Sequence, residues 1–390
     1  MKQFKNIFRT FFVAFSILLT SNNAIAQDID LSEMDSVEIG LITCSPHEEI
    51  YSLYGHTALR YHDLKRGIDG IYNWGVFDYT KPHFALRFVF GLTDYELGVA
   101  PTLPFCEYYE NWGSMVTEHI LNLTRQEKLN IRNALIENCK PENRVYRYNF
   151  FYDNCSTRPR NIIEQSIEGE LFYQPREDYS PTYREMLHQH NSHHVWTAFG
   201  IDLLLGIKAD AKTSRKEQEF LPDNLRYDFD RAYVMHDGKR EPFVKERRLL
   251  VPAGIQTTES DFPLRPFDIF LALMVLTAFV SFYEIYKKTK LWWYDALLMV
   301  LTGLPGLVLL LMIFSEHPTT SINLQILLLN PIALLFVWPI WKKRKTKWFL
   351  INFICLIIFL LGSFWQDYAE GMVFLALSLL FRCLDHYNDK

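Results

Sequence analysis

Two residues of this 390-residue chain have the chemical types and settings that thiol catalysis needs. Cys155 lies in the segment 152–158, with the sequence YDNCSTR, and His56 lies in the segment 54–57, with the sequence YGHT. A free thiol has a pKa of about 8.5, so it needs help to become a nucleophile at neutral pH. A helix N-terminus favours the thiolate, and a nearby imidazole can accept the proton. We therefore expect Cys155 to be a nucleophile and His56 to be its base.

A third group often orients the imidazole of such a pair. Asn73, on the strand expected after His56, is the first candidate, and Asp78 is the second. The alternative is that Cys155 is a structural cysteine, because most free cysteines are buried and inert. Polar residues on both sides of Cys155 argue against simple core packing.

Further site residues are expected in the same segments and in one nearby loop. Tyr54 and Tyr152 accompany His56 and Cys155 in their motifs. Cys44, in the break that follows a strand, is either a second functional thiol or a structural one. Arg158 or Arg160 either binds a phosphate headgroup or forms a surface salt bridge.

Short β-branched runs separated by turn residues predict the strands that would hold these side chains. The expected strands are 37–43, 57–62, 70–77, 91–100, 116–123 and 145–150. Thr124 and Glu127 form a capping box that predicts a helix over 124–137. After the last strand, Asp153 or Asn154 can cap a second helix that carries Cys155. This mixture predicts an α+β domain.

The later part of this region is less regular. Residues 195–207 are apolar with helical spacing and are expected to shield the site or to lie near a bilayer. Residues 236–239, with the sequence HDGK, predict a hairpin turn within 231–244. Four histidines within 188–194 are expected in a solvated polar loop, and we expect no metal and no other cofactor.

Both ends of the chain predict a protein that is inserted in a membrane. Residues 1–26 have the basic start, apolar run and Ala-Ile-Ala end of a signal peptide. Residues 27–264 form the outer domain, and residues 265–390 form a transmembrane domain of about five spans. The expected spans are 266–286, 294–314, 322–341, 347–365 and 368–384, each near the ~20 residues that cross a bilayer.

Charge and cysteine content narrow the class of protein further. Lysine and arginine follow the first and third spans and are absent after the second and fourth, which places the outer domain outside the cytoplasm. The net charge of −5 gives no indication of nucleic-acid binding. Few cysteines are present, and a Cys106–Cys139 disulfide is an open alternative.

Three segments carry a resemblance to a known family. Residues 54–60 (YGHTALR), 72–78 (YNWGVFD) and 152–158 (YDNCSTR) resemble the periplasmic domain of the Lnb family, and so do 196–206 and 220–222. The resemblance covers roughly residues 35–225, and the multi-span tail fits the same architecture. It implies a permuted papain-like, NlpC-related fold in which histidine precedes cysteine, as His56 precedes Cys155.

Lnb proteins are bacterial lipoprotein N-acyltransferases of the inner membrane, so the resemblance implies that activity. It implies a phospholipid acyl donor and a diacylated lipoprotein acceptor, with Cys155 as the acyl carrier. Two other classes stay open: a membrane-anchored periplasmic cysteine peptidase or amidase that acts on the cell wall, and a non-enzymatic envelope assembly protein.

Overall fold

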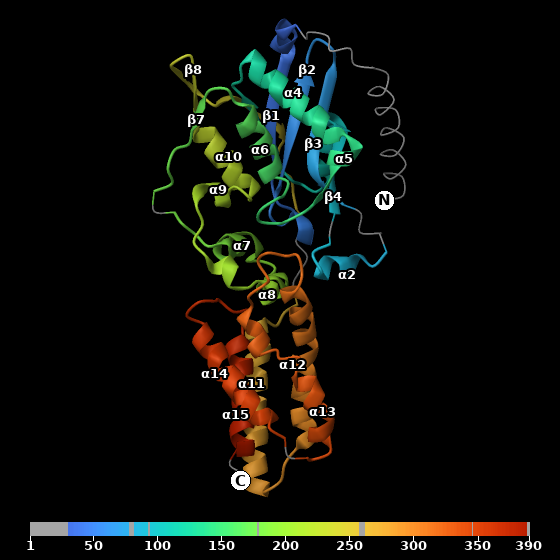
Figure 1. The fold of residues 1–390 in the computed structure, drawn as a ribbon, viewed down its shortest axis with the longest axis vertical. Coiled ribbons are helices and arrows are strands. Elements are labelled where there is room, and N and C mark those ends of the chain that lie inside the picture. Colours follow the sequence, from blue (N-terminus) through green and yellow to red (C-terminus); the bar gives the residue numbers. More distant parts are fainter. Residues whose placement is uncertain are drawn as a thin grey trace.

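The computed structural model describes residues 30–77, 82–92, 94–177, 179–256, 262–344 and 346–387. Within these residues, a mixed α/β part over 30–256, here called the sheet domain, stands on one end of a helical bundle over 262–387 (Figure 1). The expected signal peptide, 1–26, lies outside the described residues.

Antiparallel strands form the main sheet in the order β10-β5-β1-β2-β3-β4-β6. Their bounds are β1 (Val37–Cys44), β2 (His56–Asp63), β3 (Ile68–Val76), β4 (Asp94–Pro101), β5 (Val116–Leu121), β6 (Val145–Arg147) and β10 (Val244–Val251). The six expected strands are confirmed, although β6 is shorter than predicted. The pattern did not reveal β10, because charged residues fill its middle and it lies at the sheet edge.

A small second sheet of β7 (Glu170–Phe172), β8 (Tyr233–His236) and β9 (Lys239–Pro242) contains the expected hairpin. The helices of this domain are α2 (Phe84–Val89), α3 (Thr102–Asn111), α4 (Arg125–Cys139), α5 (Pro141–Arg144), α6 (Thr157–Ser166), α7 (Tyr183–Asn191), α8 (Val195–Leu204), α9 (Arg215–Gln218) and α10 (Pro222–Arg231). Short 3₁₀ helices cover η1 (Leu31–Ser36), η2 (Ile50–Ser52) and η3 (Ile207–Asp210). The capping box of Thr124 and Glu127 begins α4, as predicted.

Helices cover both faces of the main sheet. On one face, Ile39, Leu59 and Trp74 pack with residues of α4, α6 and α10. On the other face, Ile42 and Ala58 pack with residues of α3. The alternation of side chains along each strand separates these two clusters. The strands are thereby buried on both sides, which holds their ends in fixed positions.

The bundle contains α11 (Pro266–Lys287), α12 (Trp292–Ile313), η4 (Leu324–Leu327), α13 (Ala333–Trp341), α14 (Trp348–Gly362) and α15 (Met372–Tyr387). By length and apolar composition, α11 and α12 are each able to cross a membrane. The segment 322–341 is not one continuous helix, because Pro331 and the polar residues before it interrupt it. That each of the five segments crosses the bilayer stays a prediction.

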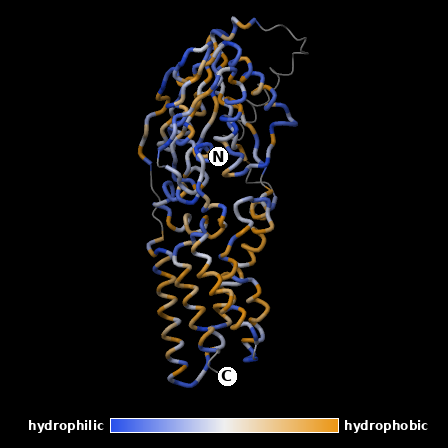
Figure 2. The backbone as a smooth tube through the Cα atoms, turned by 60° about the vertical axis from the view of Figure 1, so that its left-hand side comes forward, coloured by the Kyte–Doolittle hydropathy of each residue, from blue (hydrophilic) through white to orange (hydrophobic). Residues whose placement is uncertain are grey.

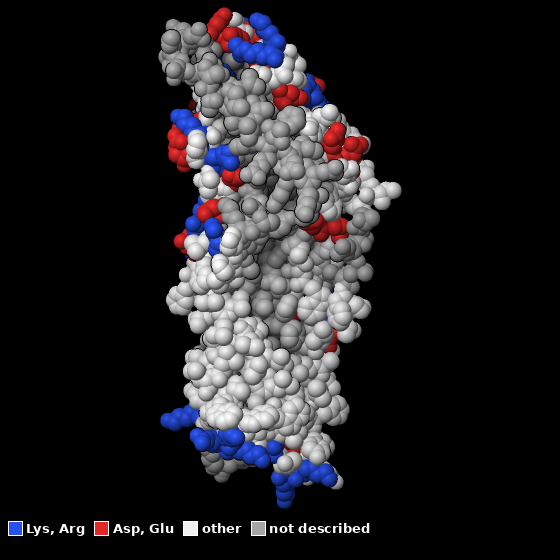
Figure 3. Space-filling view, turned by 90° about the vertical axis from the view of Figure 1, so that its right-hand side faces the viewer, with Lys and Arg blue, Asp and Glu red and all other residues white. Residues whose placement is uncertain are grey.

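The surface of the bundle has the polarity of a membrane protein. Hydrophobic residues dominate along the helices, whereas the sheet domain is mixed (Figure 2). Lysine and arginine gather at the end of the bundle away from the sheet domain, and an uncharged band separates them from the charges of that domain (Figure 3). This distribution agrees with an outer sheet domain and a cytoplasmic basic end.

The sheet domain docks on the bundle at two places. At α8, the Gly206 and Ile207 N–H groups donate to the carbonyls of Thr319 and Ile322, at 2.9 and 2.8 Å. Near α2, the Glu316 N–H donates to the Phe90 carbonyl at 3.0 Å. The expected helix is confirmed over α8, and the residues that follow it lie against the bundle.

Side-chain amides strengthen the α8 contact. Asn323 and Gln325 donate to the Leu203 and Asp202 carbonyls, both at 2.9 Å, and Gln366 donates to the Leu205 carbonyl at 3.1 Å. These amides satisfy carbonyl groups at the C-terminal end of α8, which the helix itself leaves without partners. The bundle thus fixes how the sheet domain sits above the membrane.

Candidate active site

His56 and Asn73 lie together at one end of the main sheet. His56 is the first residue of β2 and pairs with Cys44, the last residue of β1. Its Nε2 lies 2.6 Å from Oδ1 of Asn73 on β3. An amide oxygen only accepts hydrogen bonds, so Nε2 carries the proton and Nδ1 is free to act as the base. Asn73, the first candidate for the group that orients the imidazole, therefore lies next to His56 in the structure.

Asn154 shapes the turn that carries Cys155. Its Oδ1 accepts hydrogen bonds from the N–H groups of Ser156 and Thr157, both at 2.9 Å. Its Nδ2 donates to the Phe150 and Phe220 carbonyls, both at 2.8 Å. The side chain is buried, and these four bonds satisfy it fully. The N-cap residue of α6 is Ser156 and not Asp153 or Asn154, so Cys155 lies before the helix, in a turn that Asn154 anchors.

Cys155 and His56 form a hydrogen-bonded acid–base pair. Burial opposes ionisation of the thiol, but the charge of His56 and hydrogen bonds from His56, the Thr57 N–H and Ser156 leave the pKa of Cys155 below its ordinary value. Burial likewise opposes the imidazolium, yet the charge and hydrogen bond of Cys155, with the bond to Asn73, raise the pKa of His56. Both shifts favour a thiolate–imidazolium pair.

Gly75 keeps the space beside the pair open. Its φ of +151° favours glycine, and it occupies a bulge between Trp74 and Val76 in β3. A Cβ atom there would lie 3.1 Å from Cε1 of His56 and 3.8 Å from Cβ of Cys155. A side chain at this position would therefore crowd both His56 and Cys155.

One backbone N–H is available to stabilise a developing oxyanion. Asn154 occupies the N–H groups of Ser156 and Thr157, which removes them as donors. The Cys155 N–H, in contrast, has no acceptor among the residues that the structure describes. When a thiolate attacks a substrate carbonyl, the backbone N–H of the nucleophilic residue can donate a hydrogen bond to the oxyanion that forms.

The end of the sheet that holds this pair faces the bundle. The connection from β3 to β4 leaves the sheet at this end and carries α2, which contacts the loop after α12. The linker from β10 to α11 also passes here, because the Gln256 side chain donates to the Pro46 carbonyl at 2.8 Å. Figure 1 shows α2 and α8 between the sheet and the helices.

Cys44 has the properties of a structural residue. It is 1% exposed and packs with Ile42 and Phe105 on the face that α3 covers. Burial raises the pKa of its thiol well above the ordinary value, although Tyr109 donates a hydrogen bond to it. A neutral thiol in this position supports the strand pairing behind His56 and has little nucleophilic character.

Other predicted residues lie around the pair rather than in it. Tyr54 is buried against Phe150, and Asn191 donates to its hydroxyl at 3.4 Å. Tyr152 is 44% exposed at the mouth of the turn. Asp78, the second-choice third group, lies outside the described residues.

Both candidate arginines have carboxylate partners. Arg158 forms two hydrogen bonds with Asp153, at 2.6 and 2.7 Å, and its guanidinium stacks on the Tyr146 ring. Arg160 pairs with the buried Glu219 at 3.3 Å. Arg158 forms the expected kind of salt bridge near the surface, whereas the salt bridge of Arg160 is buried.

Two other expectations need correction or comment. Cys106 and Cys139 are free and pack in different clusters, so they form no disulfide in this structure. The histidines expected in a solvated loop instead end α7 and follow it, and His188 contacts Asp202 at 2.8 Å. The loop prediction was wrong because the capping box of Thr182 and Glu185 starts a helix there.

Sequence reasoning missed three contributors to the site. Thr57 and Ser156 join β2 to the start of α6 through hydroxyls 2.9 Å apart. Gly75 was part of a matching motif but was assigned no role. The sequence does show that Thr57 follows His56 and that Ser156 follows Cys155, and this proximity could have drawn attention to both residues.

Family models match both parts of the chain. The Lnb N-terminal periplasmic domain matches residues 24–189, which include His56, Asn73 and Cys155. The Lnb transmembrane domain matches residues 257–389. The chain belongs to the Lnb family. As an Lnb protein it has a periplasmic domain and a transmembrane domain and resides in the inner membrane. No curated protein and no solved structure matched the chain.

Proposed function

We propose that this Lnb protein is a lipoprotein N-acyltransferase. It moves an acyl chain from a phospholipid to the α-amine of the N-terminal cysteine of a diacylated lipoprotein. Cys155 is the nucleophile, His56 is the base and Asn73 orients the imidazole. The observation that carries the proposal is the Cys155–His56–Asn73 arrangement at the end of the sheet that faces the bundle.

In the first step, the Cys155 thiolate attacks the ester carbonyl of a phospholipid. A carbon–sulfur bond forms, the ester carbon–oxygen bond breaks, and the imidazolium of His56 gives its proton to the departing lysophospholipid oxygen. The Cys155 N–H is placed to stabilise the oxyanion that develops. The product of this half-reaction is an acyl thioester on Cys155.

In the second step, the α-amine of the lipoprotein attacks the thioester carbonyl. A carbon–nitrogen bond forms, the carbon–sulfur bond breaks, and Cys155 leaves as a thiolate. His56 accepts the proton that the amine loses, which restores the ion pair. Because the donor product departs before the acceptor reacts, the kinetics are ping-pong.

The position of the site favours transfer between lipids. Both substrates keep their acyl chains in the bilayer and present their reacting groups at its outer surface. The contacts through α2 and α8 hold the sheet end with Cys155 toward that surface. A soluble cell-wall substrate would have no need of this anchoring, which favours the transferase over the peptidase alternative.

The topology also supports a permuted papain-like fold. His56 begins a strand, Asn73 lies on the next strand, and Cys155 lies two residues before α6, which packs against β2. In papain-like enzymes the cysteine precedes the histidine in the chain, whereas here the order is reversed. We propose that the catalytic geometry is retained despite this change of order.

Lipoprotein N-termini provide the test. The full chain and its Cys155→Ser variant are expressed in cells that lack their own lipoprotein N-acylation, and the N-terminal peptides are analysed by mass spectrometry. We expect triacylated N-termini with the wild type and diacylated N-termini with the variant. Cys44→Ser is the matched control and should retain activity.

Two results would contradict the proposal. Diacylated N-termini with a well-expressed wild type would exclude the acyltransferase function. Equal activity of Cys155→Ser and the wild type would keep the function but remove Cys155 from its role as nucleophile.

A further inference from the structure

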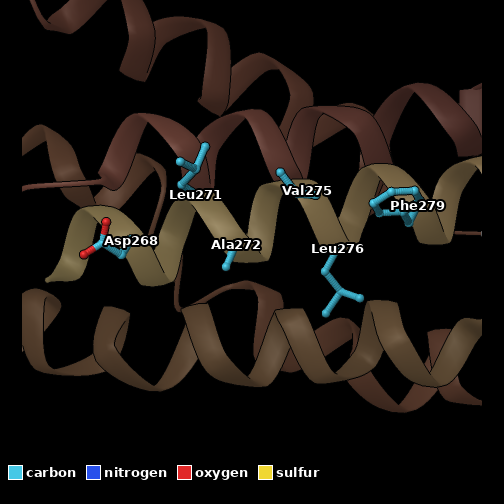
Figure 4. Close-up of a pocket in the computed structure, with 6 residues that line it drawn as sticks. All are labelled: Asp268, Leu271, Ala272, Val275, Leu276 and Phe279. Carbon is cyan, nitrogen blue, oxygen red and sulfur yellow. The ribbon is translucent and has the colours of Figure 1, made fainter. Parts of the chain in front are cut away.

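Helix α11 presents two stripes of residues at helical spacing. One stripe faces the bundle, where Phe270, Leu273 and Val280 pack in its core. The other stripe lines a hollow on the bundle surface, here called the α11 groove, which consists of Asp268, Leu271, Ala272, Val275, Leu276 and Phe279 (Figure 4). Its volume is about 500 Å³, within the range of ligand sites.

The groove is open sideways to lipid. In their cytoplasmic halves α11 and α12 are joined, since Thr277 Oγ1 and the Tyr294 hydroxyl lie 2.7 Å apart and Arg382 bridges Glu284 and Asp295. Along the bundle, α11 packs mainly on α15, whereas α12 packs mainly on α13. Of the residues that line the groove, Leu271 is partly buried and the others are exposed, with Phe279 at 68%.

The dimensions of the groove suit one acyl chain. Eleven residue steps separate Asp268 from Phe279, which is about 16 Å of helix at about 1.5 Å per residue. One leaflet of the hydrocarbon core is about 15 Å thick, half of the bilayer's ~30 Å. The groove therefore extends from the periplasmic rim to about the middle of the bilayer. Its walls below Asp268 are entirely apolar.

The charge at the rim selects among lipid headgroups. Asp268 stands at the top of the groove, where its carboxylate accepts a hydrogen bond from the Arg265 N–H at 3.1 Å, and the Arg265 side chain is paired with Glu370 at 2.9 Å. These three residues carry one positive and two negative charges at neutral pH. A phosphate is disfavoured beside such a rim, whereas a protonated amine is favoured. An α-amine has a pKa of about 7.7–8.0 and is mostly protonated at neutral pH.

We propose that the α11 groove is the docking site for the acceptor: it holds one acyl chain of the diacylated lipoprotein, with Asp268 near the α-ammonium. This inference rests on the proposed function, because it identifies the ligand by the acceptor's chemistry. The chain is surrounded by apolar groups in the groove and in the bilayer alike, so the groove contributes orientation more than hydrophobic energy. It holds the acceptor next to the linker that leads up to the site.

A bulky substitution within the groove tests its role. Full-length protein in nanodiscs of phosphatidylethanolamine and phosphatidylglycerol is assayed with a synthetic diacylated lipopeptide. Ala272→Trp should raise the KM for the lipopeptide at least about threefold, because the indole fills the groove. Lysophospholipid release without acceptor reports the donor half-reaction alone, and we expect the variant to lower it by a smaller factor than it raises the KM for the lipopeptide. Ala278→Trp, on an exposed part of α11 outside the groove, is the matched control.

The rim charge has its own test. Asp268→Asn should weaken binding of the free-amine lipopeptide by about two- to fivefold, which corresponds to an exposed ion pair. It should leave binding of the N-acetylated lipopeptide unchanged, because that ligand has no ammonium. An equal effect on both lipopeptides would exclude the charge contact.

Photocrosslinking separates this inference from the proposed function. A lipopeptide with a diazirine in one acyl chain should label residues 268–279, and excess unlabelled lipopeptide should reduce the labelling. Labelling that only excess phospholipid reduces would overturn the acceptor assignment, as would slower lysophospholipid release in Ala272→Trp with an unchanged KM. If N-acylation itself is absent but labelling persists, the proposed reaction fails while the binding site stands.

Discussion

His56 donates a hydrogen bond from Nε2 to Oδ1 of Asn73, 2.6 Å away, and this bond leaves Nδ1 as the base for Cys155. The contact joins the first residue of β2 to the middle of β3, two paired strands of the main sheet. The tautomer of the imidazole is therefore set by the pairing of two strands.

Removing the amide should slow acyl-enzyme formation. In Asn73→Ala the imidazole loses the partner that fixes its tautomer, and we expect the rate of lysophospholipid release to fall about 10- to 100-fold, within the range of general-base contributions. Stability should change little, since His56 and Asn73 are only partly buried. An unchanged rate would show that another group orients the imidazole.

The pH dependence of thiol reactivity should report the ion pair. The lowered pKa of Cys155 means that the thiolate persists below the pH at which a free thiol, with a pKa of about 8.5, becomes protonated. The rate of alkylation by iodoacetamide should therefore keep its high-pH value down to a lower pH than for a free cysteine. His56→Ala should move the inflection upward, and Cys44→Ala should leave it in place. A wild-type inflection at or above that of a free thiol would contradict the pairing.

Asn154 should matter for stability as well as for the site. Asn154→Ala removes a buried side chain with four hydrogen bonds and should lower the free energy of unfolding by about 2–4 kcal/mol. Asp153→Ala, which breaks the neighbouring ion pair with Arg158, should cost at most about 1 kcal/mol because Asp153 is partly exposed. Thermal unfolding of both variants measures these two losses of stability. Equal losses would mean that Asn154 does not anchor the turn.

A side chain at Gly75 should reduce activity by obstructing the site and not through backbone strain alone. Gly75→Ala places a methyl group 3.1 Å from Cε1 of His56, so we expect loss of most lysophospholipid release. Gly67→Ala is the control, because Gly67 also has a positive φ, of +65°, but has nothing within 4 Å of the new Cβ. Both variants carry backbone strain of about 1 kcal/mol. If both lose activity equally, the effect is strain and not obstruction of the site.

Docking on the bundle should matter for lipid substrates only. A Cβ on Gly206 would lie 2.1 Å from the Ile322 carbonyl oxygen, so Gly206→Ala should disturb the α8 contact. We expect lower acyl transfer from lipid with unchanged alkylation of Cys155 by a water-soluble reagent. Gly200→Ala, on α8 with nothing within 4 Å, should behave as the wild type. Loss of both activities in Gly206→Ala would indicate damage to the site itself.

The local patterns predicted most of the sheet and the residues of the candidate catalytic pair. β-branched and apolar runs located β1 to β6, and the motif residues located His56, Asn73 and Cys155. Both signals depend on neighbours in the chain, which a sequence displays directly. The capping boxes did the same for α4, although the equivalent box before α7 was overlooked.

Features that depend on distant contacts could not be predicted in this way. Asn323, Gln325 and Gln366 donate to carbonyls at the end of α8, which lies more than a hundred residues away along the chain. The loss of the Ser156 and Thr157 N–H groups to Asn154 likewise follows from the folded turn. The edge strand β10 was missed because its exposed charges hide the usual alternation.

The acyl-enzyme itself tests the central claim most directly. Wild-type protein in nanodiscs, without acceptor, is quenched in acid, and its mass and peptides are measured. We predict one acyl group on the peptide that contains Cys155, removed by neutral hydroxylamine, and no adduct in Cys155→Ser. An adduct on another residue such as Cys44, or N-acylation without any acyl-enzyme, would contradict the account.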